Sequence, residues 1–234
     1  MAGVGGFGRF TFSERNRMTK YQAVLFDLDG TLLDTLGDIS GAVNRALVKN
    51  GFPGHSFKIC RSFIGDGART LISRALPKGF ATDEIIARCL ADFRQDYALN
   101  WHLTTRPYPR IPELLDQLSN QGVRFSVLSN KPHEFTVKCV EKFLPDWPFE
   151  VVFGQRENVP LKPDPSVALE IARRMNLQPA ACLFVGDSPV DMKTGANAGM
   201  DAVGVGWGFT ERRDLAAYHP GVIVVEPMEI LDLM

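Results

Sequence analysis

FDLDGTL, residues 26–32, ends a short apolar run that begins at Ala23. A continuous apolar run of this length is typical of a strand buried in a parallel sheet. Asp27 and Asp29 are two positions apart, so in an extended backbone their side chains point to the same side. At the carboxyl end of a parallel strand, both would face the crevice in which α/β proteins bind ligands. Such close carboxylates need a cation or a shared proton, which suggests metal-assisted phosphate chemistry, although Asp-Gly alone would also suit a turn.

Three further polar segments follow in chain order. They are SNK at 129–131, after the apolar run 125–128; KPDP at 162–165, before a helical pattern; and GDSPVD at 186–191, after the apolar run 182–185. Together with FDLDGTL, this set resembles the haloacid dehalogenase (HAD) superfamily of phosphotransferases. The resemblance covers nearly the whole chain from about Tyr21 onward.

Short apolar runs alternate with helical patterns along most of the chain. This alternation predicts an α/β fold with a Rossmann-like parallel sheet. Asp164 is placed as the N-cap of one helix, with Pro165 at its first position, and Gly199 is placed to close the helix after Asp191. The predicted strands are Ala23–Asp27, Arg124–Ser129, Val151–Gly154, Cys182–Gly186, Ala202–Val205 and Val222–Val225.

The interval from residue 34 to residue 106 breaks this rhythm, because its apolar residues recur only at helical spacing. In the HAD family, a helical insert after the first strand is a cap that closes over the site. The resemblance therefore implies a core domain of residues 21–33 and 107–234, with a cap domain of residues 34–106 inserted after the first strand. Two hinge strands are expected near residues 31–34 and 104–107. Residues 1–20 are expected to be a flexible tail without a secretory signal, and Met18 is a candidate for the natural start.

The resemblance also implies a role for each carboxylate. Asp27 would be the nucleophile that forms an aspartyl-phosphate, and Asp29 would be the general acid and then the base. Mg²⁺ would be bound by Asp27, the backbone carbonyl of Asp29 and Asp187, while Asp191 would hold a metal-bound water. Asp187 and Asp191 would also suit an N-cap with an acid in the first helical turn.

Three residues of the second and third motifs would bind the phosphoryl group. Ser129 and Asn130 would hold its oxygens with a hydroxyl and nearby backbone N–H groups, and Lys162 would neutralise Asp27 and the phosphate. Lys131 could be a second cation or the solvated start of a helix, and the solvated helix start is favoured. Since dehalogenases lack an aspartate at the position of Asp29, that residue argues against dehalogenation.

Substrate choice is expected to depend on the cap. Residues 63–71 resemble the specificity loop of phosphoglycolate phosphatases, as do residues 107–109 and 129–132, although Arg110 departs from the usual glycine. Arg69 could bind a substrate carboxylate or could simply be a solvated helix residue. Arg106 is a weaker alternative for the same contact.

The expected activity is therefore that of a Mg²⁺-dependent phosphatase acting on a small phosphate monoester, and the resemblance favours phosphoglycolate as that substrate. The alternatives are a phosphatase for a sugar phosphate, a nucleotide or pyrophosphate, a phosphomutase, and a non-catalytic phosphate-binding regulator. A net charge of −1 gives no electrostatic footprint for nucleic acid or membrane. Four cysteines without motif spacing fit a cytoplasmic protein, expected as a monomer or small homo-oligomer.

Overall fold

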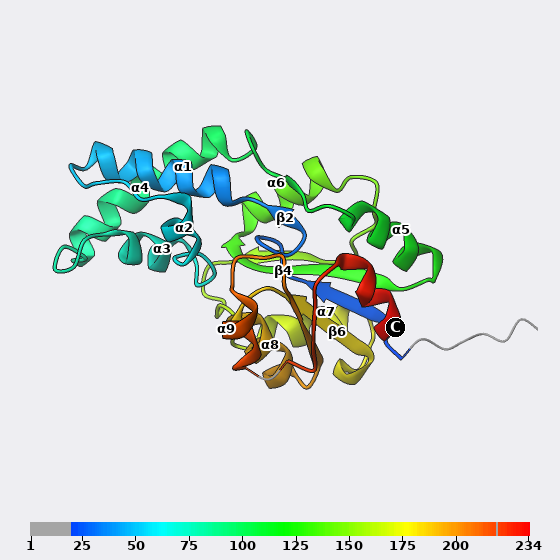
Figure 1. Ribbon diagram of the computed structural model, residues 1–234. Coiled ribbons are helices and arrows are strands. Elements are labelled where there is room, and N and C mark those ends of the chain that lie inside the picture. The colour runs from blue at the N-terminus through cyan, green and yellow to red at the C-terminus, as the bar shows by residue number, and fades with distance from the viewer. Residues whose placement is uncertain (1–19, 219) are drawn as a thin grey trace, which may run out of the picture.

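The computed structural model describes residues 20–218 and 220–234. The predicted tail of residues 1–20 and the candidate start at Met18 lie outside this range, except for Lys20. The Nζ of Lys20 is 3.2 Å from Asp201 Oδ2. A six-stranded sheet, in the order β5-β4-β1-β6-β7-β8, forms the centre of the molecule (Figure 1). Each neighbouring pair of its strands is parallel, which confirms the predicted α/β fold class. The strands are β1 Ala23–Phe26, β4 Arg124–Pro132, β5 Val152–Gln155, β6 Cys182–Gly186, β7 Asp201–Val205 and β8 Val222–Val224.

Strand β1 lies between β4 and β6, and its four residues are fully buried. Alternate residues of β1 serve the two faces of the sheet, because successive side chains of a strand point to opposite sides. Val24 and Phe26 belong to the hydrophobic cluster that includes the helix residues Leu114, Leu115 and Leu118. Ala23 and Leu25 belong to a second cluster with Val167, Ala168 and Ile171. Burial on both faces explains why the β1 sequence is a continuous apolar run.

Helices cover both faces of the sheet (Figure 1). On one face, α5 and α6 contribute to the cluster that contains Phe26; on the other, α7 packs with Leu25. Helix α7 begins at Ser166, one residue later than predicted, because Pro165 is the N-cap and Asp164 accepts a hydrogen bond from Ser166 N at 2.9 Å. Gly199 ends α8 at a φ of 69°, as predicted. These elements are α5 Ile111–Asn120, α6 His133–Phe143, α7 Ser166–Arg174, η1 Pro179–Ala181, α8 Pro189–Ala198, α9 Arg212–Ala216 and η2 Pro227–Leu233.

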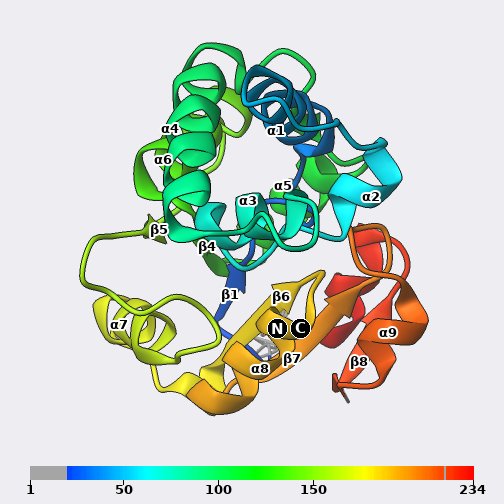
Figure 2. The same ribbon diagram turned by 90° about the vertical axis from the view of Figure 1, so that its left-hand side faces the viewer.

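Residues 35–105 form a separate helical insert, which stands over one end of the sheet (Figure 2). Its helices are α1 Leu36–Lys49, α2 Phe57–Arg61, α3 Ala68–Ala75 and α4 Asp83–Asn100, and they share a hydrophobic cluster of their own. The chain enters through β2 Leu33–Asp34 and leaves through β3 Arg106–Pro107, and these two strands pair antiparallel. None of the helices in residues 20–218 and 220–234 is long and apolar enough to cross a membrane.

The buried carboxylate of Asp38 joins the two chain segments at this crossing. It lies in the first turn of α1 and accepts hydrogen bonds from the backbone N–H of both Thr104 and Thr105, each at 2.9 Å for the shorter contact. Both threonine hydroxyls also donate to it, at 2.7 Å. The start of α1 is therefore tied to the segment that returns to the sheet.

Candidate active site

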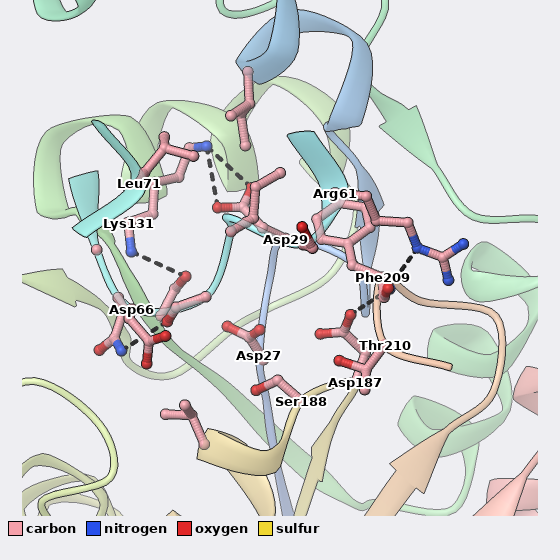
Figure 3. A pocket seen from close by; sticks show the side chains of 18 of the residues that line it. Asp27, Asp29, Arg61, Asp66, Leu71, Lys131, Asp187, Ser188, Phe209 and Thr210 are labelled. Carbon is pink, nitrogen blue, oxygen red and sulfur yellow. Dashed lines mark hydrogen bonds and ion pairs between the residues drawn. The ribbon is translucent and has the colours of Figure 1, made fainter. Parts of the chain in front are cut away.

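A cavity of about 930 Å³ lies between the carboxyl ends of the central strands and the helical insert. Its floor includes Asp27 after β1, residues 129–131 of β4 and Asp187 after β6, so the sheet brings together residues that are far apart in the sequence. Its roof includes residues of all four helices of the insert, α1 to α4. Figure 3 shows Asp27 and Asp187 close together on the floor, with Arg61 on the side of Phe209. This is the crevice at which parallel α/β sheets bind ligands.

Asp27 is buried at the end of β1, and Lys162 Nζ is 2.8 Å from its Oδ1. Burial, together with the negative charges of Asp191 and Asp29, raises the pKa of Asp27 to about 7, although Lys162 opposes the shift. The carboxyl group of Asp27 therefore needs positive charge nearby to be fully ionised at neutral pH.

Lys162 is the cation closest to this carboxylate, and its side chain is only 3% exposed. Its Nζ also lies 2.6 Å from Asp191 Oδ1. Burial alone would lower the pKa of Lys162, but Asp191 and Asp27 outweigh it and raise the pKa above its usual value. The backbone N–H of Lys162 donates to Asn130 Oδ1 at 2.9 Å, so β4 sets the position of the loop that carries this lysine.

Asn130 is buried, and its side chain is engaged by the protein. The amide nitrogen donates to Lys162 O at 3.1 Å and to Gly65 O, in the helical insert, at 3.0 Å. The side-chain amide thus bridges β4, the Lys162 loop and the insert. The adjacent Ser129 is also buried, and its Oγ accepts a hydrogen bond from Lys131 N at 3.3 Å.

Three buried carboxylates come together beside Lys162. Asp27, Asp187 and Asp191 can each offer one oxygen within 4.8 Å of the others. Burial raises the pKa of Asp187 well above its usual value, and the charges of Asp191 and Asp27 add to the shift. Three carboxylates and one lysine leave a surplus of negative charge, and an all-oxygen donor set of this kind fits a hard divalent cation.

The interpretation of Asp191 as a first-turn acid of α8 agrees with its hydrogen bonds. Asp191 Oδ2 accepts from Ser188 N at 3.0 Å and from Ser188 Oγ at 2.5 Å, and Ser188 is the N-cap. This capping box uses Oδ2 and leaves Oδ1 for Lys162. One carboxylate therefore both stabilises the helix start and belongs to the acidic cluster.

The favoured interpretation of Lys131 as a solvated helix start is wrong. Its side chain is 3% exposed, and its Nζ lies 3.0 Å from Asp29 Oδ1 and 2.7 Å from the hydroxyl of Tyr97. Lys131 is still in β4, one residue before Pro132 ends the strand, which keeps the side chain inside. Tyr97 belongs to α4, so a residue of the helical insert reaches the same lysine that holds Asp29.

Arg69, the candidate for the substrate contact, is not among the residues that line the cavity. Its guanidinium pairs with Asp83 at 2.5 Å, and the side chain of Arg69 is 55% exposed. The face of α3 that packs inward carries Ala68, Leu71, Ile72 and Ala75, and Arg69 lies off that face. Arg106 also lies outside the cavity and pairs with Asp34 at 3.4 Å. The basic residues that do line it are Lys58, Arg61, Arg74, Arg94, Lys131, Lys193 and Arg213.

The loop after β7 is a part of the site that the sequence analysis missed. The backbone N–H of Phe209 donates to Asp187 Oδ2 at 2.5 Å, and Trp207 Nε1 donates to Thr31 O at 3.0 Å. From the helical insert, Arg61 Nε donates to Phe209 O at 2.5 Å, and Arg61 Nη2 donates to Gly208 O. No motif marks residues 207–209, so the sequence signal for this loop was absent.

The chain is similar in sequence and in fold to known proteins. The chain is 33% identical over 205 residues to a phosphoglycolate phosphatase of Pseudomonas putida, covering 86% of this chain and 75% of that protein. It is 32% identical over 222 residues to a phosphoglycolate phosphatase of Mannheimia succiniciproducens, covering 92% of this chain and 99% of that protein. A crystal structure from Lactobacillus delbrueckii subsp. bulgaricus superposes with a TM-score of 0.87 at 28% identity, covering 92% and 99% of the two chains.

The family comparison covers the central motifs as well as the helical insert. The model of the haloacid dehalogenase-like hydrolases matches residues 24–205, a segment that runs from β1 to the end of β7. It contains the FDLDGTL segment and the acidic cluster. The chain therefore belongs to the family of haloacid dehalogenase-like hydrolases.

Proposed function

We propose that this protein is a Mg²⁺-dependent phosphatase that hydrolyses a small phosphate monoester through an aspartyl-phosphate on Asp27. One observation carries the proposal: the buried Asp27 lies 2.8 Å from Lys162 and shares an acidic cluster with Asp187 and Asp191. A carboxylate in this setting can act as a nucleophile toward an anionic phosphate, because cations offset the charge that both reactants bring. The relatives named phosphoglycolate phosphatase support a phosphoric monoester as the substrate, with phosphoglycolate favoured.

In the first step, an oxygen of Asp27 attacks phosphorus while the bond from phosphorus to the leaving oxygen breaks. Lys162 keeps Asp27 ionised and attracts the phosphoryl oxygens through its charge. Asp29 gives its proton to the leaving alcohol, and Ser129 at the end of β4 offers a hydroxyl to the phosphoryl group. The product of this step is an alcohol and a phosphorylated Asp27.

In the second step, water attacks phosphorus and the Asp27–phosphate bond breaks, which releases inorganic phosphate. Asp29 takes a proton from that water and so recovers the proton that it gave away. Asp27, Asp187 and the backbone carbonyl of Asp29 would hold Mg²⁺, with Asp191 supporting the ion through a bound water, and the ion when bound would neutralise negative charge on the phosphoryl oxygens. The chain supplies the nucleophile, the proton carrier and the fixed cation Lys162.

We propose that residues 34–106 are the cap domain of this enzyme and that residues 21–33 and 107–234 are its core domain. The insert provides the roof of the cavity, and its residues Tyr97 and Arg61 contact core groups next to the proposed reacting residues. The basic side chains of the insert that line the cavity are Lys58, Arg61, Arg74 and Arg94, and Arg74 pairs with Asp66 at 2.5 Å. Positive charge on the roof suits a substrate with a second anionic group.

The test is a phosphate-release screen over small phosphorylated metabolites, run with Mg²⁺ and again after EDTA treatment. Phosphoglycolate should be among the best substrates by kcat/KM, and EDTA should abolish turnover until Mg²⁺ is restored. Turnover of an aryl phosphate but not of phosphoglycolate would keep the phosphatase and overturn the substrate. Isomerisation that depends on a bisphosphate would indicate a phosphomutase, and no turnover at all would favour a phosphate-binding regulator.

Two broader expectations belong to the same proposal. A small-metabolite phosphatase with four separate thiols suits the cytoplasm, and fractionation of the native host would test this location. Because the cavity is built from the core and the insert of one chain, a monomer or a small homo-oligomer would be active, and sedimentation of the active enzyme would tell the two apart.

A further inference from the structure

We propose that Arg61 is a positioning residue through which the helical insert sets the geometry of Asp187 and thereby the affinity of the acidic cluster for its metal. This inference rests on the proposed metal site and assigns to it a contribution from outside the core. Arg61 is the last residue of α2, in the insert, whereas Asp187 follows β6 in the core. Arg61 and Asp187 are not hydrogen-bonded to each other, but each is hydrogen-bonded to one end of the same peptide group.

That group is the peptide between Gly208 and Phe209. Its carbonyl oxygen, Gly208 O, accepts from Arg61 Nη2, and its N–H, on Phe209, donates to Asp187 Oδ2 at 2.5 Å. The next carbonyl, Phe209 O, accepts from Arg61 Nε at 2.5 Å. Arg61 therefore holds two successive carbonyls in the fork geometry of a guanidinium, and this fixes the plane of the intervening peptide.

Fixing this plane matters for Asp187 because the loop packs directly on the carboxylate. A side chain at Gly208 would collide with Asp187 and with Gly30 O, so the backbone at 208 approaches as closely as glycine allows. A positive guanidinium on the carbonyl also polarises the peptide and strengthens its N–H as a donor. With Oδ2 held in this way, the carboxylate of Asp187 has one defined orientation relative to Asp27 and Asp191.

The contact exists only while the insert lies against the core. Opening of the insert would remove both hydrogen bonds of Arg61 and leave the 208–209 peptide to hold Asp187 alone. Metal binding and closure of the insert are thus linked, and linkage is reciprocal: closure should tighten metal binding, and bound metal should favour closure. Arg61 differs in this respect from Arg69, which lies in the same insert and pairs only with the exposed Asp83.

The experiment measures Mn²⁺ binding to the full-length protein by electron paramagnetic resonance, without substrate. The variants are Arg61→Ala, Arg61→Lys, the matched control Arg69→Ala, and Asp187→Asn as a marker for the site. We expect Arg61→Ala to bind Mn²⁺ about five- to tenfold more weakly, a typical size for coupling between two sites. Arg61→Lys, which can donate to a carbonyl but without the fork, should recover part of the affinity, and Arg69→Ala should bind like the parent.

Different results overturn different statements. If the parent binds Mn²⁺ and loses it in Asp187→Asn, but Arg61→Ala and Arg61→Lys bind as tightly as the parent, the role of Arg61 is wrong and the metal site stands. Equal weakening in Arg61→Ala and Arg69→Ala would mean that general damage to the insert is responsible, which also overturns the proposal. If the parent binds no Mn²⁺, both the metal-dependent function and this inference fail. Thermal unfolding of the metal-free variants shows whether each is folded. If Arg61→Ala is not folded, the comparison of Arg61→Lys with the parent decides the question.

Discussion

The carboxyl end of the sheet and the outer surface of the helical insert both carry pairs of opposite charge, but one set is buried and the other is exposed. At the carboxyl end of the sheet, the Lys162 side chain is 3% exposed and forms ion pairs with both Asp27 and Asp191. On the insert, Arg69 is 55% exposed and its partner Asp83 is 95% exposed. Water screens the pair on the insert, whereas the buried charges depend on one another for ionisation. The buried charges are suited to catalysis, because each one affects whether its neighbours are ionised.

The largest expected effect of breaking the buried set is on Asp27. Asp27→Asn keeps the size of the side chain and removes the nucleophilic oxygen, so phosphatase turnover should fall by roughly three orders of magnitude or more. Steady-state kinetics with an aryl phosphate would measure it, with circular dichroism as the check on folding. A folded variant with near-parental turnover would exclude Asp27 as the nucleophile.

The pH dependence of metal affinity comes next. Because the pKa of Asp27 is raised to about 7 in the metal-free protein, a proton occupies this carboxyl below that pH and must leave when the metal binds. Mg²⁺ affinity should therefore fall by at least about tenfold for each pH unit below 7, because the raised pKa of Asp187 adds a second proton that the metal must displace. Calorimetric titration between pH 5.5 and 8 would measure this, and a flat affinity over that range would contradict a metal site that contains Asp27.

A smaller effect is expected where the insert meets the buried set. Tyr97→Phe removes the hydroxyl 2.7 Å from Lys131 Nζ but keeps the ring that stacks on Phe93. Lys131 loses one partner and keeps Asp29, so kcat should fall by about three- to tenfold, the net worth of one ordinary hydrogen bond. The matched control is Tyr218→Phe, which removes a hydroxyl from a ring at the cavity margin under Lys193. Equal losses in both variants would show that the Lys131 contact has no special role.

The smallest effect belongs to the exposed pair. Arg69→Ala removes a screened ion pair outside the cavity, so the free energy of unfolding should change by about 0.5 kcal/mol or less. The ratio of kcat/KM for phosphoglycolate to that for an aryl phosphate should stay within about twofold of the parent ratio. If that ratio dropped tenfold, Arg69 would have to reach the substrate after a rearrangement of α3.

The sheet and its acidic residues could be predicted because their signals are local. An apolar run followed by a carboxylate specifies both a buried strand and the place where it ends, which is why Asp27 and Asp187 were found together. Lys131 was misjudged for a different reason. Its burial depends on Tyr97 and Asp29, from α4 and the segment after β1, and no local pattern records how the insert lies on the core.

The same limit explains the two arginines of the insert. Arg69 sits next to a glycine-flanked turn that resembles a specificity loop, but its direction depends on which face of α3 packs inward. Arg61 ends a five-residue helix with no motif around it, and its partners are backbone carbonyls of residues 208 and 209. Backbone acceptors leave no trace in the sequence of either partner, so contacts of this kind have to be read from the structure.

The hydrogen bonds of Asp38 to Thr104 and Thr105 have a consequence for engineering the insert. Because they tie α1 to Thr104 and Thr105, and β2 pairs with β3, the insert is covalently joined to the core at one paired crossing. Because the two ends of the insert lie side by side, the insert can be exchanged as one unit. Exchange of residues 36–105 for the corresponding segment of a relative would leave every strand of the six-stranded sheet unaltered. Substrate preference could then be transplanted while the phosphate chemistry stays with the recipient.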